Sequence, residues 1–163
     1  MKNDTKVHGH FTVRHLDKDG NLKGEYDMPN GIVDVGMNHM LETQFNGGTP
    51  ITTWYCALID NAGFSTLANA DTMASHAGWT KLTDYTEATH PEWTAGTATG
   101  RAITNAATVD FSINATVSIN GIYITSQNVK ATDTGTLWST ASFASAVSAV
   151  NGDTLKITYT VSG

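Results

Sequence analysis

The sequence predicts a mostly β protein, an antiparallel β-sandwich or jelly roll with one short helix. The last third, residues 101–163, alternates apolar and small polar residues and carries almost no charge. Two Asn-Gly pairs, Asn120-Gly121 and Asn151-Gly152, interrupt this alternation. A period of two with β-branched residues is typical of antiparallel strands that bury one face. Strands that recur about every ten to twelve residues are typical of a sandwich or barrel.

The N-terminal region is expected to form a hairpin. Residues 8–15 and 22–26 read as strands, and the polar segment 16–21 between them contains Asp19-Gly20, a strong hairpin signal. The acidic turn also invites comparison with a calcium loop. Glycine follows the aspartate directly, however, so the spacing of an EF-hand is not met and a plain turn is favoured.

One helix is expected near residues 32–45. Apolar residues recur there near helical intervals, at Ile32, Val35, Met40, Leu41 and Phe45. The following Gly47-Gly48 predicts its end.

The middle of the chain predicts one strand and a long excursion. Residues 51–59 read as a buried strand, because apolar residues are nearly continuous at its end. Residues 69–76 suggest a short helical turn with Asn or Asp as its cap. The polar and aromatic stretch 79–93 is expected to be a long excursion with one or two short strands.

The C-terminal strands have a predicted inner face. In residues 105–114 the inward positions are Ala107, Val109, Phe111 and Ile113, and in residues 153–162 they are Leu155, Ile157, Tyr159 and Val161. Asn120-Gly121 reads as a bulge or tight turn, and Asn151-Gly152 as a hairpin turn.

The bulk composition predicts one domain, residues 1–163, in which residues 1–27 form an N-terminal arm and hairpin that could serve in assembly. The chain is 40% hydrophobic and 15% charged, against about 25% charged in an average globular protein. A net charge of −6 with scattered basic residues argues against nucleic-acid binding. No secretory signal or membrane-spanning stretch is visible, so no membrane partner is expected. The single Cys56 excludes an intramolecular disulfide and fits synthesis in a reducing cytoplasm.

Two candidate reactive groups receive a structural interpretation. His8 and His10 share one strand face and His15 has the opposite phase, but nothing supplies the further ligands that a zinc site needs. Cys56 lies in an apolar strand, where burial raises the pKa of a thiol and leaves it inert.

The excursion holds the best candidate binding residues, Trp79, Tyr85 and Trp93. Three acidic residues lie close to them in the sequence, Asp84, Glu87 and Glu92. Aromatic rings beside carboxylates line sugar grooves, and paired carboxylates cleave glycosides. Aromatic rings also anchor loops and subunit interfaces. Anchoring or an interface is favoured over sugar binding, and sugar binding over catalysis.

Other catalytic patterns are missing from the sequence. No Gly-x-Ser-x-Gly motif presents a nucleophile, and no glycine-rich loop has the context of a phosphate site. We therefore expect no catalytic, cofactor-binding or metal-binding residue.

One resemblance rests on segments spread over residues 30–163. They are Ile51-Thr-Thr-Trp-Tyr-Cys-Ala-Leu-Ile-Asp60, Gly63-Phe64, Ala70-Asp-Thr-Met-Ala-Ser-His76, Trp79, Tyr85, Pro91-Glu-Trp93 and Asn151-Gly-Asp-Thr-Leu-Lys-Ile-Thr-Tyr-Thr160. Together they resemble small structural proteins encoded by tailed bacteriophages. The resemblance implies a virion component and no catalytic residue.

The functional expectation is a non-enzymatic capsid decoration or cement protein on the capsid exterior, made in the host cytoplasm. Its expected partners are copies of itself, with a homotrimer favoured, and the phage major capsid protein. The alternatives are a tail or fibre accessory protein and a carbohydrate-binding module that uses Trp79, Tyr85 and Trp93. On the first reading, the Thr, Ser and Asn faces of the C-terminal strands are the working surface.

Overall fold

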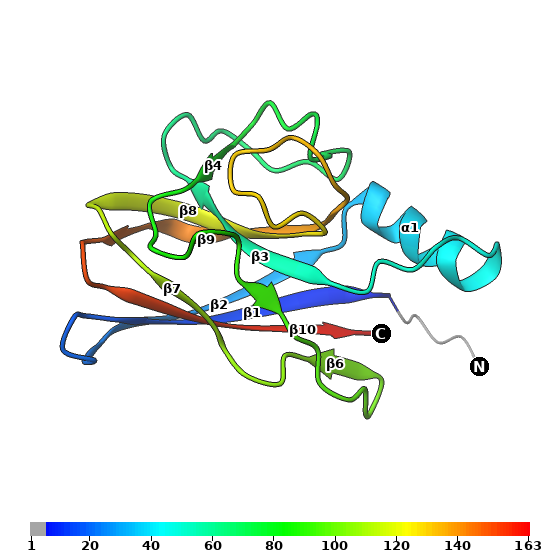
Figure 1. Cartoon of the computed structure of the whole chain (residues 1–163), viewed down its shortest axis with the longest axis horizontal. Helices are drawn as coiled ribbons and strands as arrows, with labels where there is room; N and C mark the ends of the chain where they lie inside the picture. The colour runs from blue at the N-terminus through cyan, green and yellow to red at the C-terminus, as the bar shows by residue number, and fades with distance from the viewer. Residues whose placement is uncertain (1–5) are drawn as a thin grey trace.

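The computed structural model describes residues 6–163, which form two antiparallel sheets packed as a sandwich (Figure 1). Sheet A contains β1 (His8–Leu16), β2 (Leu22–Gly31), β6 (Ala102–Thr104), β7 (Val109–Ser112) and β10 (Thr154–Ser162). Sheet B contains β3 (Trp54–Asp60), β4 (Thr80–Leu82), β5 (Glu92–Trp93), β8 (Val117–Thr125) and β9 (Leu137–Ala149). The strand order is β2-β1-β10-β6 in sheet A, where β7 also pairs with β10, and β4-β3-β8-β9 in sheet B, where β5 also pairs with β3. The predicted fold class is confirmed.

The N-terminal hairpin is an integral part of sheet A. Strand β1 pairs with β10 along its whole length, from His8 opposite Ser162 to Leu16 opposite Thr154. The turn is held by Asp17, whose carboxylate accepts backbone N–H bonds from Asp19 and Asn21 (2.9 Å each). Side-chain and backbone hydrogen bonds from Asn21 lower the pKa of Asp17. The hairpin is therefore a plain turn that joins the internal strand β1 to the edge strand β2, and residues 1–5 of the expected arm lie outside the described residues.

The single predicted helix is confirmed as α1 (Asp34–Phe45). It begins after Ile32, which forms an isolated bridge to Ser139 of β9. Gly36 is its one buried residue, and a Cβ there would lie 2.6 Å from the carbonyl oxygen of Trp138, so the glycine lets the helix approach β9 closely. The predicted glycine stop is also confirmed, because the N–H of Gly48 bonds to the Glu42 carbonyl oxygen (3.0 Å).

The core between the two sheets is built from inward-facing residues of both. Its fully buried members include Phe11, Val13, Cys56, Leu58, Phe111, Ile119, Ile122, Leu155, Ile157 and Tyr159. Phe11 and Tyr159 stack with ring centroids 4.2 Å apart. The predicted alternation of residues 153–162 is thus confirmed at Leu155, Ile157 and Tyr159, whereas Val161 is only partly buried.

The strand expected over residues 105–114 is shorter than predicted. Strand β7 begins at Val109, and Ala107 is exposed, so its predicted burial is wrong. The reason is Asn105, whose buried side chain donates to the carbonyl oxygens of Ala107 (2.6 Å) and Ile157 (3.0 Å). An asparagine that bonds its local backbone in this way favours a turn over a strand.

The two Asn-Gly pairs adopt different geometries, and each is one that the sequence predicted. At Asn120-Gly121 the pairing register of β8 shifts, which is a bulge within a continuous strand. Asn151-Gly152 joins β9 to β10, with Gly152 at φ +95°.

A third layer covers the outer face of sheet B. The loop of residues 61–79 and the start of α1 bury a second apolar cluster against β3, β8 and β9, and in Figure 1 these loops lie above sheet B. The members of this cluster are Val33, Ala57, Ile59, Met73, Trp79, Tyr123 and Leu137. The loop contains turns where a short helical turn was expected for residues 69–76, because the Asp71 carboxylate accepts the N–H of Ala68, a residue that precedes it (2.9 Å).

No helix among residues 6–163 has both the length and the apolar character needed to cross a membrane.

Candidate functional site

The three aromatic residues proposed as a binding site from sequence are buried. The exposed fractions of Trp79, Tyr85 and Trp93 are 2%, 1% and 8%. Trp79 belongs to the cluster on the outer face of sheet B, whereas Tyr85 and Trp93 belong to the core between the sheets. The structure therefore does not bring the three rings together on one exposed surface, and their packing fits the anchoring interpretation.

The neighbouring carboxylates are more exposed than those rings. Asp84 and Glu92 are exposed, and Glu87 is half-buried. The Glu87 carboxylate accepts the backbone N–H of Ser112 (3.1 Å), and Glu92 accepts the hydroxyl of Thr94 (3.2 Å). Because the rings are buried and the acids are at the surface, this region does not form the aromatic-lined acidic groove considered from sequence.

The histidines of β1 lie on opposite faces of the strand, as the alternation of side chains along it predicts. His8 is exposed, His10 is half-buried, and His15 on the opposite face is buried. His15 Nε2 lies 2.7 Å from the carboxylate of Asp153, which also accepts from Lys23 Nζ (2.6 Å). No group of three or more His, Cys, Asp or Glu side chains within residues 6–163 is placed to hold a metal ion.

Cys56 is fully buried, as expected from its strand. Desolvation by that burial raises the pKa of its thiol. A neutral, inaccessible thiol is a poor nucleophile.

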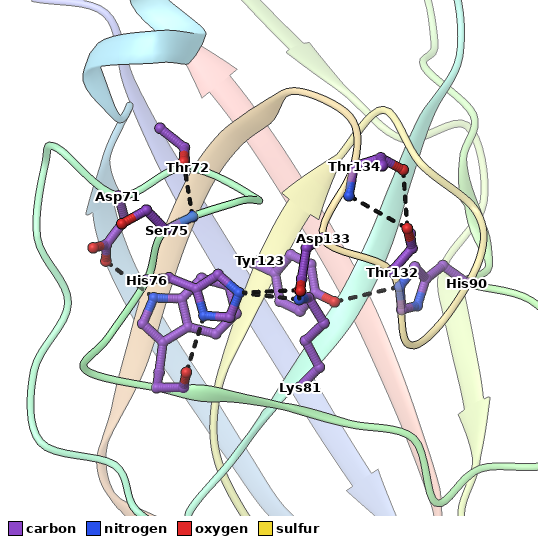
Figure 2. A network of polar contacts seen from close by, with 11 residues as sticks. Asp71, Thr72, Ser75, His76, Lys81, His90, Tyr123, Thr132, Asp133 and Thr134 are labelled. Atoms are coloured by element: carbon purple, nitrogen blue, oxygen red, sulfur yellow. Dashed lines mark hydrogen bonds and ion pairs between the residues drawn. The ribbon is translucent and has the colours of Figure 1, made fainter.

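A polar network joins two loops above sheet B (Figure 2). Lys81 of β4 donates to Asp133, in the loop of residues 126–136, and lies 3.0 Å from His76 Nε2. His76 Nδ1 lies 3.0 Å from the carbonyl oxygen of Trp79, and the indole N–H of Trp79 donates to Asp71 (3.0 Å). The hydrogen bond and charge of Lys81 lower the pKa of Asp133. The contacts tie the loop of residues 61–79 to the loop of residues 126–136.

His90 forms a second polar centre under the same loops. It is 1% exposed, and its ring lies between two tyrosine hydroxyl groups, with Tyr85 at 2.6 Å from Nδ1 and Tyr123 at 3.3 Å from Nε2. Burial, with the positive charges of Lys130 and Lys81, lowers the pKa of His90 to about 4. Burial raises the pKa of both tyrosines. The imidazole and the two hydroxyl groups are therefore neutral near pH 7, which suits a structural clamp.

One serine–histidine contact lies on the surface. Ser162 and His8 are direct cross-strand partners, and the serine hydroxyl lies 3.1 Å from His8 Nε2. The other ring nitrogen of His8 lies 2.9 Å from the backbone carbonyl oxygen of Lys6. Within residues 6–163 no carboxylate is hydrogen-bonded to this histidine, as a Ser-His-Asp triad requires, and the pair lies exposed on two paired strands.

A cavity of about 250 Å³ is lined by three of the four tryptophans. We call it the tryptophan cavity; its walls are Met40, Trp54, Trp93, Ile103, Ile124, Trp138, Tyr159 and Val161. Trp54 and Trp93 are direct partners in the β3–β5 pairing, and the ring centroids of Trp54 and Trp138 are 5.7 Å apart. Sequence reasoning singled out Trp93 but missed Trp54 and Trp138, because these residues are brought together only by the packing of distant strands.

Compared with family models, curated proteins and solved structures, the chain matches none of them.

Proposed function

We propose that this chain is a non-enzymatic structural protein of a phage particle that stabilises the capsid exterior through contacts between its own copies, with a trimer favoured. The resemblance to small virion proteins supports the phage assignment. The observation that carries the assembly role is the open outer face of sheet A.

That face is the polar strand surface expected from sequence. Along β10 the outward positions are occupied by three threonines, a lysine and a serine, all half-buried, while β2 and β1 contribute the exposed Glu25, Asp27 and Arg14. The corresponding face of sheet B is covered by loops. The threonines of this uncovered face are short, so covering them with another flat surface orders few rotamer-rich side chains.

The charges on this face are suited to a second copy of the same chain. Arg14 and Lys156 are cross-strand partners near its centre, and Glu25 is opposite Arg14 on the edge strand β2. Lys156 also pairs with Asp110 of β7. Because both signs are present, the acidic edge of one copy can lie against the basic centre of the next copy, which gives specificity to an interface repeated around a ring.

The test is to place a charge at the centre of this face. Thr158 lies opposite Thr12 in the β1–β10 pairing, so Thr158→Arg adds a long cation there without touching the core. The matched control is Ser145→Arg, at an exposed position of β9. Light scattering after size-exclusion chromatography should show an oligomer for the native chain and the control, and a monomer for Thr158→Arg. The native chain and the control should also sediment with capsid shells from which this protein is missing, whereas Thr158→Arg should not.

The proposal is overturned if the native chain is monomeric at tens of micromolar and does not sediment with the shells. A monomer whose fluorescence responds to polysaccharide would instead support the carbohydrate-binding alternative.

A further inference from the structure

The tryptophan cavity is a preformed space that the assembly proposal does not use. Sheet A contributes β6 and β10 to its walls, sheet B contributes β3, β5, β8 and β9, and Met40 of α1 stands beside Trp54 and Trp138. Of the residues that the structure describes, none with a charged side chain lines the cavity. Its chemistry is therefore set by indole rings and aliphatic groups.

The polar groups of the cavity wall are largely committed to one another. The indole N–H of Trp93 donates to the carbonyl oxygen of Tyr159 (3.1 Å), and that of Trp138 donates to the Tyr159 hydroxyl (3.0 Å). Within residues 6–163, the Trp54 N–H is the one indole donor of the three without a hydrogen bond. A sugar placed here would leave most of its hydroxyl groups unpaired, which costs free energy for each group.

The same bonds hold the rings in place. Two indoles are fixed to Tyr159, whose ring is itself stacked on Phe11, so the wall does not need to be ordered by a ligand. A preformed apolar pocket loses little conformational entropy when it is filled.

The volume limits the size of the occupant. An apolar cavity of about 150 Å³ holds a benzene molecule. At about 250 Å³ the tryptophan cavity has room for one ring with substituents or for two fused rings.

We propose that the tryptophan cavity is a binding site for a small, uncharged aromatic ligand of one or two rings. The ligand stacks against the indoles of Trp54, Trp93 and Trp138 and displaces water from apolar walls. Met40 borders the cavity from α1, and its unbranched side chain can move aside to admit the ligand.

The experiment uses the four indole N–H signals of ¹⁵N-labelled protein, with toluene as the probe. Trp79 lies in the other apolar cluster and is an internal control. Toluene should shift the signals of Trp54, Trp93 and Trp138 in a saturable manner and leave that of Trp79 in place. Glucose at the same concentration should shift none of the four.

A filled cavity should lose this response. Val161 is a partly buried wall residue, so Val161→Phe places a ring in the space with little cost to the core, and should weaken toluene binding at least tenfold. The matched control, Val129→Phe, changes an exposed valine and should bind like the native chain. Met40→Phe is a second blocking variant if Val161→Phe does not fold.

Three results would overturn the proposal. The first is that toluene shifts all four indole signals equally or shifts none of them. The second is unaltered toluene binding in both blocking variants. The third is loss of the three shifts when the protein is concentrated, which would mean that a second copy occupies the cavity. The first two results do not depend on the assembly proposal, and the third is checked with Thr158→Arg, which leaves the cavity wall unchanged.

Discussion

At the scale of single residues, His90 shows how burial fixes a protonation state. The ring is held between two tyrosine hydroxyl groups, and its pKa of about 4 lies below the ordinary value of 6.5. Between these two pH values the unfolded chain binds a proton that the folded chain does not. Stability is therefore complete above about pH 6.5 and falls as the pH is lowered toward 4.

This linkage predicts a loss of about 2 kcal/mol in the free energy of unfolding between pH 7 and pH 5. His90→Gln retains a donor and an acceptor but does not titrate, so it should lack this part of the pH dependence. Urea unfolding of both proteins at the two pH values measures the difference. Equal pH dependence in the two proteins would show that His90 is not the group responsible.

The indole N–H of Trp79 makes one hydrogen bond, to Asp71, and we expect it to stabilise the fold because this acceptor is buried. The indole N–H and the N–H of Ala68 both reach the Asp71 carboxylate, which is 8% exposed. Trp79→Phe keeps an aromatic ring but leaves that carboxylate short of a donor, at a cost of about 1 to 3 kcal/mol. Trp54→Phe is the control, since the Trp54 N–H makes no hydrogen bond within residues 6–163. If both variants lose equal stability in urea, the bond to Asp71 contributes nothing of its own.

At the scale of elements, the turns and the helix end could be predicted from the sequence because they depend on local residues. The Asp17 turn, the end of α1 at Gly47-Gly48 and the Asn151-Gly152 hairpin were all predicted, because each depends on residues only a few positions apart. Asn105 was not recognised as a turn residue; its bond to Ala107 is local, but its bond to Ile157 joins residues that are remote in sequence. The prediction that Trp79, Tyr85 and Trp93 form one site also failed, because contacts between remote residues decide where each ring packs.

The aromatic residues illustrate that limit. Trp79, Tyr85 and Trp93 are close in sequence, yet they lie in two different apolar clusters. Trp54 and Trp138 are far apart in sequence and share one cavity with Trp93. Periodicity tells which face of a strand is apolar, but the partner of that face is decided by tertiary packing.

Two hairpin turns are joined by an ion pair of which only the carboxylate is buried, and this gives a prediction at the scale of elements. Lys23 of β2 contacts the 2%-exposed carboxylate of Asp153 beside β10. Burial alone would raise the pKa of Asp153, but hydrogen bonds from Lys23, Val150 and His15 outweigh it and lower the pKa. The folded state therefore depends on the charged carboxylate being paired.

Lys23→Met leaves that carboxylate without its cation and should cost on the order of 2 kcal/mol, because an unpaired buried charge is strongly unfavourable. The control is Lys18→Met, which removes an exposed pair with Asp19 and should cost less than about 0.5 kcal/mol. Thermal or urea unfolding compares the two. Equal small losses would mean that water already compensates Asp153.

At the scale of the whole molecule, the sandwich has a third layer that the alternating pattern concealed. Strand β8 is buried on both faces from Gly121 to Thr125, and β3 is buried on both faces from Cys56 to Ile59. Continuous apolar runs at Cys56–Ile59 and at Ile122–Ile124 are the sequence signal for this arrangement. For the proposed assembly, the consequence is that sheet A keeps an open polar face, whereas the outer face of sheet B is covered by loops.

Adjacent residues of β3 test this three-layer architecture. Leu58 packs between the sheets and Ile59 packs under the loop of residues 61–79, and both are fully buried. Leu58→Ala and Ile59→Ala should therefore each destabilise the protein by about 2 to 5 kcal/mol, as buried aliphatic truncations do. In a two-layer sandwich one of two neighbouring strand residues faces water, and its truncation would cost little. Urea unfolding followed by circular dichroism, with exposed Ser148→Ala as the control, decides between these cases. A nearly neutral Ile59→Ala would mean that the loops above sheet B add no stability to the sandwich, and sheet B would then offer a second open face for assembly.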